Sequence, residues 1–589
     1  MIIRSVVKRG VYFDSVTLML AQQEVRQRPG VVEAGLILAT EANLALLRDA
    51  GLLTPGAQAA GPDDLVISVS GESEDAVAQA LALAEELLTR RGRATAEAEY
   101  RPRTIAAARR LLPEATVAAI SVPGRFAGDV AREALLAGLH VFLFSDNVPI
   151  ETEVALKRLA SERGLVVMGP DCGTALIGGV GLGFANKIRR GTVGIVAAAG
   201  TGLQEVATLI HRYGGGVSHA IGTGGRDVTA AVGGATMLQG LAALAADPDT
   251  AVIVLIAKPP HPIVAARLLG AAQRAGKPAV IVFVGSRVPS QGRVSGADTL
   301  EDAARAAVRL AEGGAAAADP PSQALPVQEA ARLLPGQRYL RGLFSGGTLC
   351  AEAQVLLRRY IGRVSSNAPL DPADAIDGPG ASREHTVWDL GADEFTQGRL
   401  HPMIDPSLRV QRLAQEADDP EVGVILLDVV LGFGADRDPA RHLGPAIAGA
   451  RRRALDGGRY LCVVGALCGS DEDPQDYGTQ REVLLEAGMV VESSNARAAR
   501  LAGRILAGRG ARRQEEAIPL LEVAPAEVDL PDPAEVTRLL RTPPQVINIG
   551  LDLFAESLRE QRVAVVDLDW RPPAGGKKHL LELLDKLEA

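Results

Sequence analysis

The stretch GTGLQE at Gly200–Glu205 occurs a second time as GTLCAE at Gly347–Glu352, and a tyrosine follows each glutamate at the same distance, at Tyr213 and Tyr360. Each copy comes directly after an apolar run. This order predicts a strand, a glycine-rich turn and a helix. The first N–H groups of a helix have no partner within it and carry the positive end of its dipole. Each turn is therefore a candidate anion site.

The duplication decides between two interpretations of these turns. A single Gly-Thr pair at the start of a helix is most simply a structural cap. Two copies favour one phosphate or carboxylate bound between two helix N-termini, and we expect both turns to face one cavity across a pseudo-two-fold axis. The residues expected to bind the anion are Gly200, Thr201, Gly346, Gly347 and Thr348.

Composition excludes several classes of function. The chain has 589 residues, a net charge of −9 and no long basic run, which argues against a nucleic-acid partner. Its four cysteines include no CxxC pair, so no metal site or disulfide framework is expected. No apolar run approaches the roughly 20 residues that span a bilayer, and the N-terminus lacks a signal-peptide pattern. We expect a cytoplasmic protein without membrane contact.

Apolar strands alternate with helices along the chain, which predicts a multidomain α/β fold with parallel sheets. The repeat extends beyond the turns, because DPDTAVIVL at Asp247–Leu255 lines up with DPEVGVILL at Asp419–Leu427. The expected units are a small α/β domain at 1–99, a Rossmann-like domain at 100–190, duplicated flavodoxin-like domains at 191–313 and 337–510 with a linker at 314–336 between them, and a C-terminal α/β tail at 511–589.

The second copy is longer than the first, and its additional residues fall between Gly362 and Leu413. There the segment GRLHPMID, Gly398–Asp405, sets Arg399, His401 and Asp405 among prolines. Loops of this kind often carry function, although a solvated connection explains the composition equally well.

Three further residues are candidates for the site. Glu205 and Glu352 end the two repeated motifs, and Cys172 lies in the segment GPDCGT. A cysteine at such a turn is a candidate nucleophile. No histidine stands near Cys172 in the sequence, however, so a small buried thiol is the simpler interpretation.

The order of GPDCGT and GTGLQE resembles the α subunit of succinyl-CoA synthetase, in which a Rossmann CoA-binding domain precedes a ligase domain. The second copy resembles the ligase domain of the partner β subunit, so residues 104–508 are similar to the NDP-forming acyl-CoA synthetase superfamily. GRLHPMID and VINIGLDLF…DWRPPAGG, at Val546–Gly576, are similar to the FdrA family over nearly the whole length. The resemblance implies a CoA-binding-type domain followed by two ligase-type domains.

The chain departs from the synthetases at three places. Their phosphorylated histidine lies in a loop that corresponds here to Gly292–Ala297, which contains Arg293 and Ser295 but no histidine. No Gly-rich CoA turn precedes Thr104, and no ATP-grasp domain is present. We therefore expect no cofactor to be required within this chain, do not assign CoA binding to it, and expect inorganic phosphate as a co-substrate.

The FdrA resemblance implies a subunit of a phosphate-dependent carbamoyltransferase in purine (allantoin) catabolism. Oxalurate, a small anionic substrate, and phosphate would give oxamate and carbamoyl phosphate, with further carbamoyltransferase subunits in an oligomer. Arg293 or Arg399 would stabilise the carbonyl oxygen, and His401 would protonate the leaving nitrogen. The alternatives are an acyl-CoA synthetase that acts with a nucleotide-binding partner, and a non-catalytic scaffold or regulatory subunit.

Overall fold

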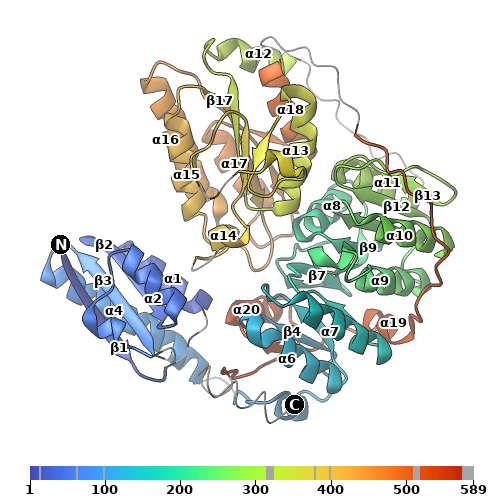
Figure 1. The fold of residues 1–589 in the computed structure, drawn as a ribbon, viewed down its shortest axis with the longest axis horizontal. Helices are drawn as coiled ribbons and strands as arrows, with labels where there is room; N and C mark the ends of the chain where they lie inside the picture. Colours follow the sequence, from blue (N-terminus) through green and yellow to red (C-terminus); the bar gives the residue numbers. More distant parts are fainter. Residues whose placement is uncertain are drawn as a thin grey trace.

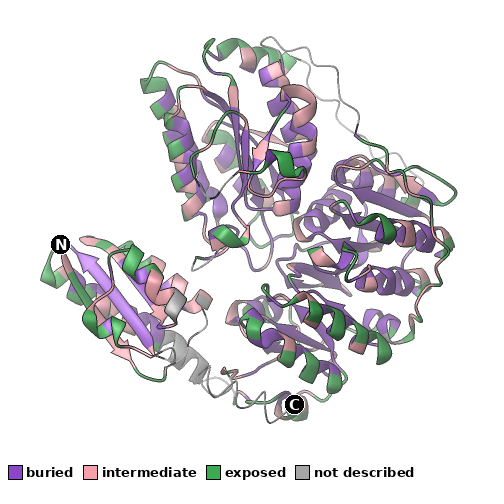
Figure 2. Ribbon diagram, viewed as in Figure 1, coloured by how far each residue is buried: buried purple, intermediate pink, exposed green. Residues whose placement is uncertain are grey.

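The computed structural model describes residues 1–572 except 12, 14, 62–63, 97–99, 313–323, 377, 379, 397–398 and 508–517. Three sheets flanked by helices form the main body, and a small N-terminal domain lies to one side of it (Figure 1). The strands are buried, and the exposed residues gather on the outer faces of the helices (Figure 2). This confirms the predicted multidomain α/β fold.

The N-terminal domain is a three-stranded antiparallel sheet in the order β1-β3-β2. Its central strand is buried at every position, because residues of α1 and α4 pack on one face and residues of α2 and α3 on the other. The predicted alternation of strands and helices is confirmed here. The elements are β1 (Ile2–Lys8), α1 (Ser15–Arg26), β2 (Val31–Leu38), α2 (Glu41–Asp49), α3 (Pro55–Gln58), β3 (Leu65–Gly71) and α4 (Glu74–Ala96).

The Rossmann-like domain has a five-stranded parallel sheet in the order β21-β20-β4-β5-β6. Its first segment supplies α5 (Ile105–Leu111), β4 (Val117–Ile120), α6 (Gly124–Leu136), β5 (His140–Leu143), α7 (Ile150–Glu162) and β6 (Val167–Met168). Its second segment comes from the end of the chain and supplies β20 (Val546–Ile549), α20 (Asp552–Glu560) and β21 (Val565–Asp567).

The expectation of a separate C-terminal tail is therefore wrong. β20 pairs with β4 from Val546 opposite Val117 to Ile549 opposite Ile120, so the end of the chain completes the first parallel sheet. From this pair the connections run in opposite directions, toward β21 on one side and toward β5 and β6 on the other. The boundary between β20 and β4 is thus the topological switch point, where open α/β sheets bind ligands at the carboxyl ends of their strands.

The two repeated units follow. The first comprises β7 (Thr174–Ile177), β8 (Val180–Gly183), β9 (Arg190–Ala198), α8 (Gly200–Arg212), β10 (Val217–Gly222), η1 (Gly225–Val228), α9 (Ala235–Ala246), β11 (Val252–Ala257), α10 (Pro262–Arg274), β12 (Ala279–Phe283), β13 (Val294–Gly296) and α11 (Leu300–Glu312). The second comprises α12 (Ala324–Arg332), β14 (Tyr339–Phe344), α13 (Gly347–Ile361), β15 (Ser365–Ser366), η2 (Pro372–Asp374), β16 (Thr386–Asp389), α14 (Asp393–Thr396), α15 (Ser407–Asp418), β17 (Val422–Val430), α16 (Pro439–Asp456), β18 (Cys462–Cys468), α17 (Tyr477–Glu486), β19 (Met489–Glu492) and α18 (Asn495–Ala507).

The strand orders show that the two units share one topology. The parallel strands run β13-β12-β11-β9-β10 in the first unit and β19-β18-β17-β14-β16 in the second. Numbered from the strand before the GT turn, both follow the flavodoxin-like order 2-1-3-4-5. The first unit adds the β7-β8 hairpin, and the second adds β15.

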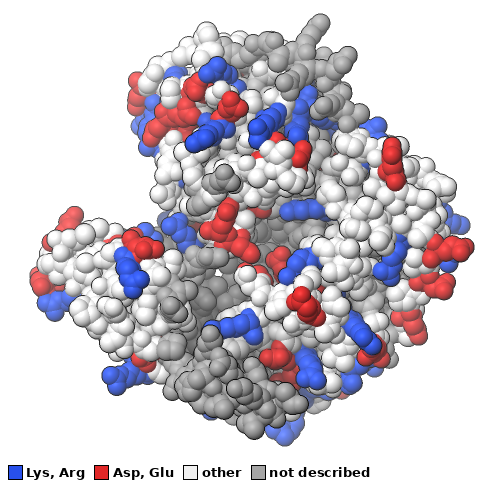
Figure 3. Space-filling view, in the orientation of Figure 1, with Lys and Arg blue, Asp and Glu red and all other residues white. Residues whose placement is uncertain are grey.

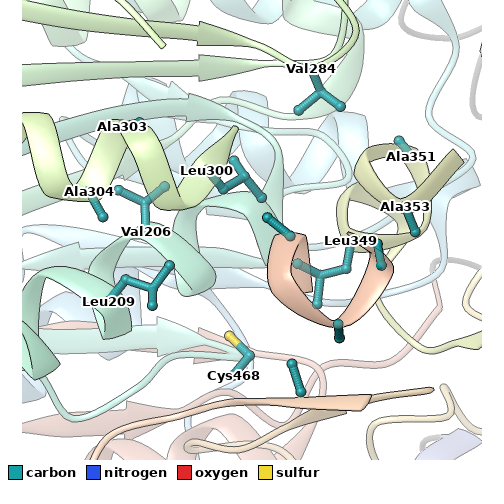
Figure 4. Packing of buried hydrophobic residues seen from close by; sticks show 14 of the residues in the cluster. Val206, Leu209, Val284, Leu300, Ala303, Ala304, Leu349, Ala351, Ala353 and Cys468 are labelled. Carbon is teal, nitrogen blue, oxygen red and sulfur yellow. The ribbon is translucent and has the colours of Figure 1, made fainter. Parts of the chain in front are cut away.

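Helices that begin at the GT turns join the two units. α8 packs on α11 and α13 packs on α18, while α8 also contacts α13 (Figure 4). Val206 and Leu209 of α8 lie opposite Ala303 and Ala304 of α11, and one continuous apolar core runs through both units. The GT turns are therefore held in place by buried packing.

The segments that connect the units differ from expectation in one respect. Of the predicted linker, residues 314–323 lie outside the described residues, whereas Ala324–Arg332 forms α12 and packs on α18. After the second unit the chain returns across the first, where Pro519 and Leu521 pair with Arg287. It then forms α19 (Ala534–Arg541) against α9 and enters β20.

Candidate functional site

A cavity of about 550 Å³ lies where the three large domains meet. The segments that follow β4, β5 and β20 reach it from the Rossmann-like sheet, at the switch point. Both GT turns reach it from the repeated units, and Val16 at the start of α1 reaches it from the N-terminal domain. Because ligands bind at the carboxyl ends of parallel strands, this cavity is the candidate active site.

The two GT turns contact each other at the cavity wall. The backbone N–H of Thr348 donates to Thr201 Oγ1 at 3.3 Å. A Cβ placed on Gly202 would lie 2.9 Å from Thr348 Cγ2, and one on Gly346 would lie 2.9 Å from Thr201 Cγ2. Glycine at both positions permits this close approach. The prediction that both turns face one shared cavity is confirmed.

The helices at these turns begin without side-chain caps. Ala199 precedes α8 and Gly346 precedes α13, and neither supplies a side-chain hydrogen bond to the first turn of its helix. Gly200, Thr201, Gly347 and Thr348 line the cavity, whereas the Gly346 N–H donates to Asp428 at 2.7 Å. The Thr348 N–H is used by Thr201 Oγ1, and the remaining first-turn N–H groups, together with the two helix dipoles, give this end of the cavity a positive potential.

Lys258 adds a cation at the same end. It follows β11 directly, lines the cavity half-buried, and makes no hydrogen bond or ion pair with another described residue. Its charge acts on both Asp389 and Asp171, whose pKa values it lowers against the effect of burial. A half-buried ammonium without a partner is suited to an anionic ligand.

Asp389 ends β16 and lies beside the second GT turn. Its side chain is only 7% exposed, and Oδ1 accepts from the Gly391 N–H at 3.1 Å. A Cβ on Gly347 would lie 2.6 Å from Oδ2, so this oxygen sits against the N-terminus of α13. Burial raises the pKa of Asp389 to about 6, with Asp428 and Glu394 adding to the effect.

Three more carboxylates line the cavity: Asp146, Asp171 and Asp393. The Asp171 side chain is open to the cavity, although protein surrounds it on most sides. Burial and the charges of Asp146 and Asp393 raise its pKa to about 6. Acidic side chains also gather on the surface over α14 (Figure 3). The cavity thus combines the positive GT turns and Lys258 with an acidic group formed by Asp146, Asp171 and Asp393.

His401 faces this cavity, as expected, but not as an acid. Its Nδ1 accepts from the Met403 N–H at 3.2 Å, which assigns the hydrogen to Nε2. Burial, together with the charge of Arg409, lowers the pKa of His401 to about 4. The ring is therefore neutral near pH 7, so the expected proton donor is corrected to a hydrogen-bond donor.

Four other expected site residues lie elsewhere. Arg293 is exposed, and its carbonyl accepts from Ala279 N at the amino end of β12, opposite the end of the sheet that faces the cavity. Arg399 is exposed and does not line the cavity, and Gly398 before it lies outside the described residues. Asp405 accepts from Ser407 and from Gln23 of the N-terminal domain.

Cys172 is likewise not a nucleophile, because its thiol is buried beside the Thr174 carbonyl and burial raises its pKa to about 12. All four assignments rested on neighbourhood in the sequence. The fold separates these residues from the cavity.

Glu205 and Glu352 have a structural role in place of the expected site role. Glu205 accepts from the Asn495 N–H, which begins α18 of the other unit, at 2.9 Å. Glu352 accepts from the Leu300 N–H, which begins α11 of the other unit, at 2.8 Å. Each unit thus caps a helix of its duplicate, as a pseudo-two-fold arrangement requires.

The sequence contained a weak indication of the residues that were missed. Lys258, Asp171 and Asp389 all follow an apolar strand closely, where an open parallel sheet presents its side chains to a ligand. Single polar residues at strand ends are too common to be selected without the strand order. The order placed these three around one cavity.

Three family models match parts of the chain. Residues 1–103 match "AllF, heavy metal-associated domain", 189–285 match "CoA binding domain" and 343–505 match "CoA-ligase". The CoA-binding match covers the first repeated unit, not the Rossmann-like sheet before it. Within the described part of the chain, no group of three or more His, Cys, Asp or Glu side chains is arranged to hold a metal ion. None of the described helices has the length and apolarity needed to cross a membrane.

The uncharacterised protein YahF of Escherichia coli (strain K12) is 43% identical over 500 residues, which are 84% of this chain and 97% of YahF. The chain belongs to the YahF family. This YahF-family chain is similar over shorter stretches to subunit SauD of the ADP-forming sulfoacetate-CoA ligase of Bilophila wadsworthia (31% identity; 24% of this chain, 50% of SauD). It is also similar to the α subunit of the ADP-forming succinate–CoA ligase of Methanothermobacter thermautotrophicus (32% identity; 23% of this chain, 46% of that subunit).

Parts of the chain also match solved structures, with low TM-scores. They include a dinucleotide-forming acetyl-coenzyme A synthetase of Ca. Korarchaeum cryptofilum (TM-score 0.23, 15% identity, 67% of this chain and 82% of that chain). They also include an ATP citrate lyase of Methanothrix soehngenii (TM-score 0.28, 21% identity, 35% of this chain and 37% of that chain). With the CoA-binding and CoA-ligase matches, the YahF-family chain is an acyl-CoA synthetase-like protein with a succinyl-CoA ligase-type fold.

Proposed function

We propose that the cavity binds inorganic phosphate between α8 and α13, and that the chain transfers an acyl-type group between this phosphate and a second substrate. One observation carries the proposal: two helix N-termini whose N-cap residues supply no side-chain cap and the Lys258 ammonium line the same cavity. Both dipoles and the cation favour a bound dianion, and their positions are fixed before the ligand arrives.

The chemistry follows from the charge that develops. A phosphate oxygen attacks the carbonyl carbon of the donor, a C–O bond forms, and the bond to the leaving sulfur or nitrogen breaks with its electron pair. Negative charge gathers on the carbonyl oxygen during the attack. N–H groups of the GT turns and Nε2–H of His401 are the donors available to stabilise it. Arg293 and Arg399 have no part in this proposal.

An acyl-CoA thioester is the first candidate donor, because the matched families and relatives are CoA ligases. The two named CoA-ligase relatives are subunits, so the chain would act with a nucleotide-binding partner subunit. The free space beside the switch point would receive the CoA end of the donor. In this direction the products are an acyl phosphate and free CoA.

A carbamoyl donor such as oxalurate is the second candidate, and the acidic group of the cavity favours it. Asp146, Asp171 and Asp393 accept hydrogen bonds from N–H groups, which a ureido group supplies, whereas they repel the phosphates of CoA. The products would be oxamate and carbamoyl phosphate. The FdrA resemblance supports this more specific proposal of oxalurate as the donor.

In both cases the phosphorylated product leaves without passing through a histidine. The lone pair on Nδ1 of His401 accepts a hydrogen bond from the Met403 N–H, and Nε2 carries a hydrogen. Neither nitrogen is therefore a free nucleophile. The test uses the chain with its co-purifying subunits, inorganic phosphate, and either a short-chain acyl-CoA or oxalurate, followed by ³¹P NMR. We expect an acyl phosphate or carbamoyl phosphate. Acid-labile phosphate on a histidine, or no product from any donor, would overturn the proposal.

A further inference from the structure

Asp389 is held rigidly at the edge of the phosphate end. Its strand β16 is buried throughout and pairs with β14, with Asp389 opposite Phe344. The Asn367 side chain binds the Asp389 backbone twice, accepting from its N–H and donating to its carbonyl, both at 2.9 Å. The carboxylate position is therefore fixed by the backbone on both sides.

Its oxygens are used unequally. Oδ1 accepts from the Gly391 N–H, whereas no group in the described part of the chain donates a hydrogen bond to Oδ2. Asp428 lies on β17, on the far side of β14 from β16, and is a useful contrast, because Ser345, Gly346 and Arg409 satisfy both of its oxygens. Asp428 is thus structural. Asp389 has an oxygen available to a ligand in a cavity wall that is otherwise closely packed.

We propose that Asp389 carries the proton of the transfer reaction, through Oδ2. This rests on the proposed function. Oδ2 takes the proton of the hydrogen phosphate dianion as its oxygen attacks the carbonyl carbon, and then gives that proton to the leaving sulfur or nitrogen, which keeps the electron pair of the broken bond. Donor and hydrogen phosphate thereby give the acyl or carbamoyl phosphate and the protonated leaving group, with no other reactant.

The surrounding charges fit this role. The charged groups that act on Asp389 are Lys258 after β11, Asp428 within β17 and Glu394 on α14, and Arg409 forms an ion pair with Asp428 at 3.0 Å. Together with burial they leave the pKa of Asp389 at about 6, close to the pH at which a proton carrier both accepts and donates well. His401 does not compete, because it is neutral and its pKa is lowered to about 4. Asp171, which also lines the cavity, is the alternative carrier.

Asp389→Asn keeps the shape and removes the exchangeable proton. We expect the wild-type rate to fall below about pH 6, kcat of Asp389→Asn to be at least about 10²-fold lower, and its residual activity to lack this acidic fall. Asp171→Asn is the matched comparison and should retain that acidic limb. An unchanged rate in Asp389→Asn, or an acidic limb abolished only by Asp171→Asn, would overturn the proposal.

A binding measurement separates this proposal from the proposed function. The affinity of wild-type protein for inorganic phosphate, measured by calorimetry, should fall as Asp389 ionises above about pH 6, because the carboxylate then repels the dianion. This extra fall should be absent in Asp389→Asn. If phosphate affinity shows this pH dependence but no donor reacts, the acyl-transfer proposal fails. The placement of Asp389 beside phosphate then still holds. Phosphate binding without this pH dependence would remove Asp389 from the site, whether or not Asp389→Asn folds.

Discussion

The Thr348 backbone nitrogen lies 3.3 Å from Thr201 Oγ1, so the first turn of one repeated unit is a hydrogen-bond partner of the other. Two turns that stand far apart in the chain thus form one wall of one cavity. Neither unit alone contains this arrangement, which depends on the packing of α8 and α13 across the pseudo-two-fold axis.

Enlarging the contact between the turns should damage both stability and binding. In Gly202→Ala the new Cβ meets Thr348 Cγ2 at 2.9 Å, and such overpacking costs about 1–3 kcal/mol. A loss of about 1–3 kcal/mol in the free energy of unfolding implies a melting temperature several degrees lower. We also expect weaker phosphate binding, measured by calorimetry. Gly336→Ala is the control, because nothing lies within 4 Å of its new Cβ. Equal phosphate affinity in the two variants would show that the contact does not shape the site.

Removing the cation should weaken phosphate binding and shift the pH profile. Lys258→Met deletes a charge-assisted contact of about 1.5–3 kcal/mol, which is roughly a 10- to 100-fold loss in phosphate affinity. Lys258 also lowers the pKa of Asp389, so its removal should move the acidic limb of the rate profile to higher pH. Glu394→Gln removes a charge that raises this pKa and should move the limb to lower pH. Shifts in the same direction would contradict the assignment of that limb to Asp389.

Loss of His401 should affect rate without removing a titration. As a neutral donor to the carbonyl oxygen, it should contribute about 10²–10³-fold to kcat, so His401→Phe is expected to lose that factor. Because its pKa is lowered to about 4, the wild-type pH profile between about pH 5 and about pH 8 should show no limb that His401→Phe removes. Arg293→Ala and Arg399→Ala are controls outside the cavity and should turn over like the wild type.

Glu352 should make the fold less stable as pH rises. Burial raises its pKa to about 7 from an ordinary value of 4.5, so the folded state binds more protons than the unfolded state between these values. Its stabilising contribution is complete below the unfolded pKa and is lost as pH rises through about 7. The melting temperature of wild type should therefore fall from about pH 5 to about pH 8, and less so in Glu352→Gln. If the melting temperatures of wild type and Glu352→Gln fell equally with pH, groups other than Glu352 would cause the loss of stability.

Local sequence predicted most of the fold but not its closure. The predicted alternation of strands and helices is confirmed, because apolar periodicity fixes elements such as Ile2–Lys8 and Glu41–Asp49 locally. The repeat of the GT motif predicted the shared cavity. The pairing of β20 with β4 carries no local pattern, since it joins segments more than four hundred positions apart in sequence. The same limitation selected Arg399 beside His401 and missed Lys258, which only the strand order brings to the site.

The most direct measurement is a crystal structure of the protein soaked with phosphate, or with tungstate as its heavy analogue. The account predicts one tetrahedral anion in the cavity, within hydrogen-bond distance of backbone N–H groups from both the Gly200–Thr201 and the Gly347–Thr348 turns and of the Lys258 ammonium. An anion bound to one turn only, at the acidic group around Asp171, or covalently on a histidine would contradict it.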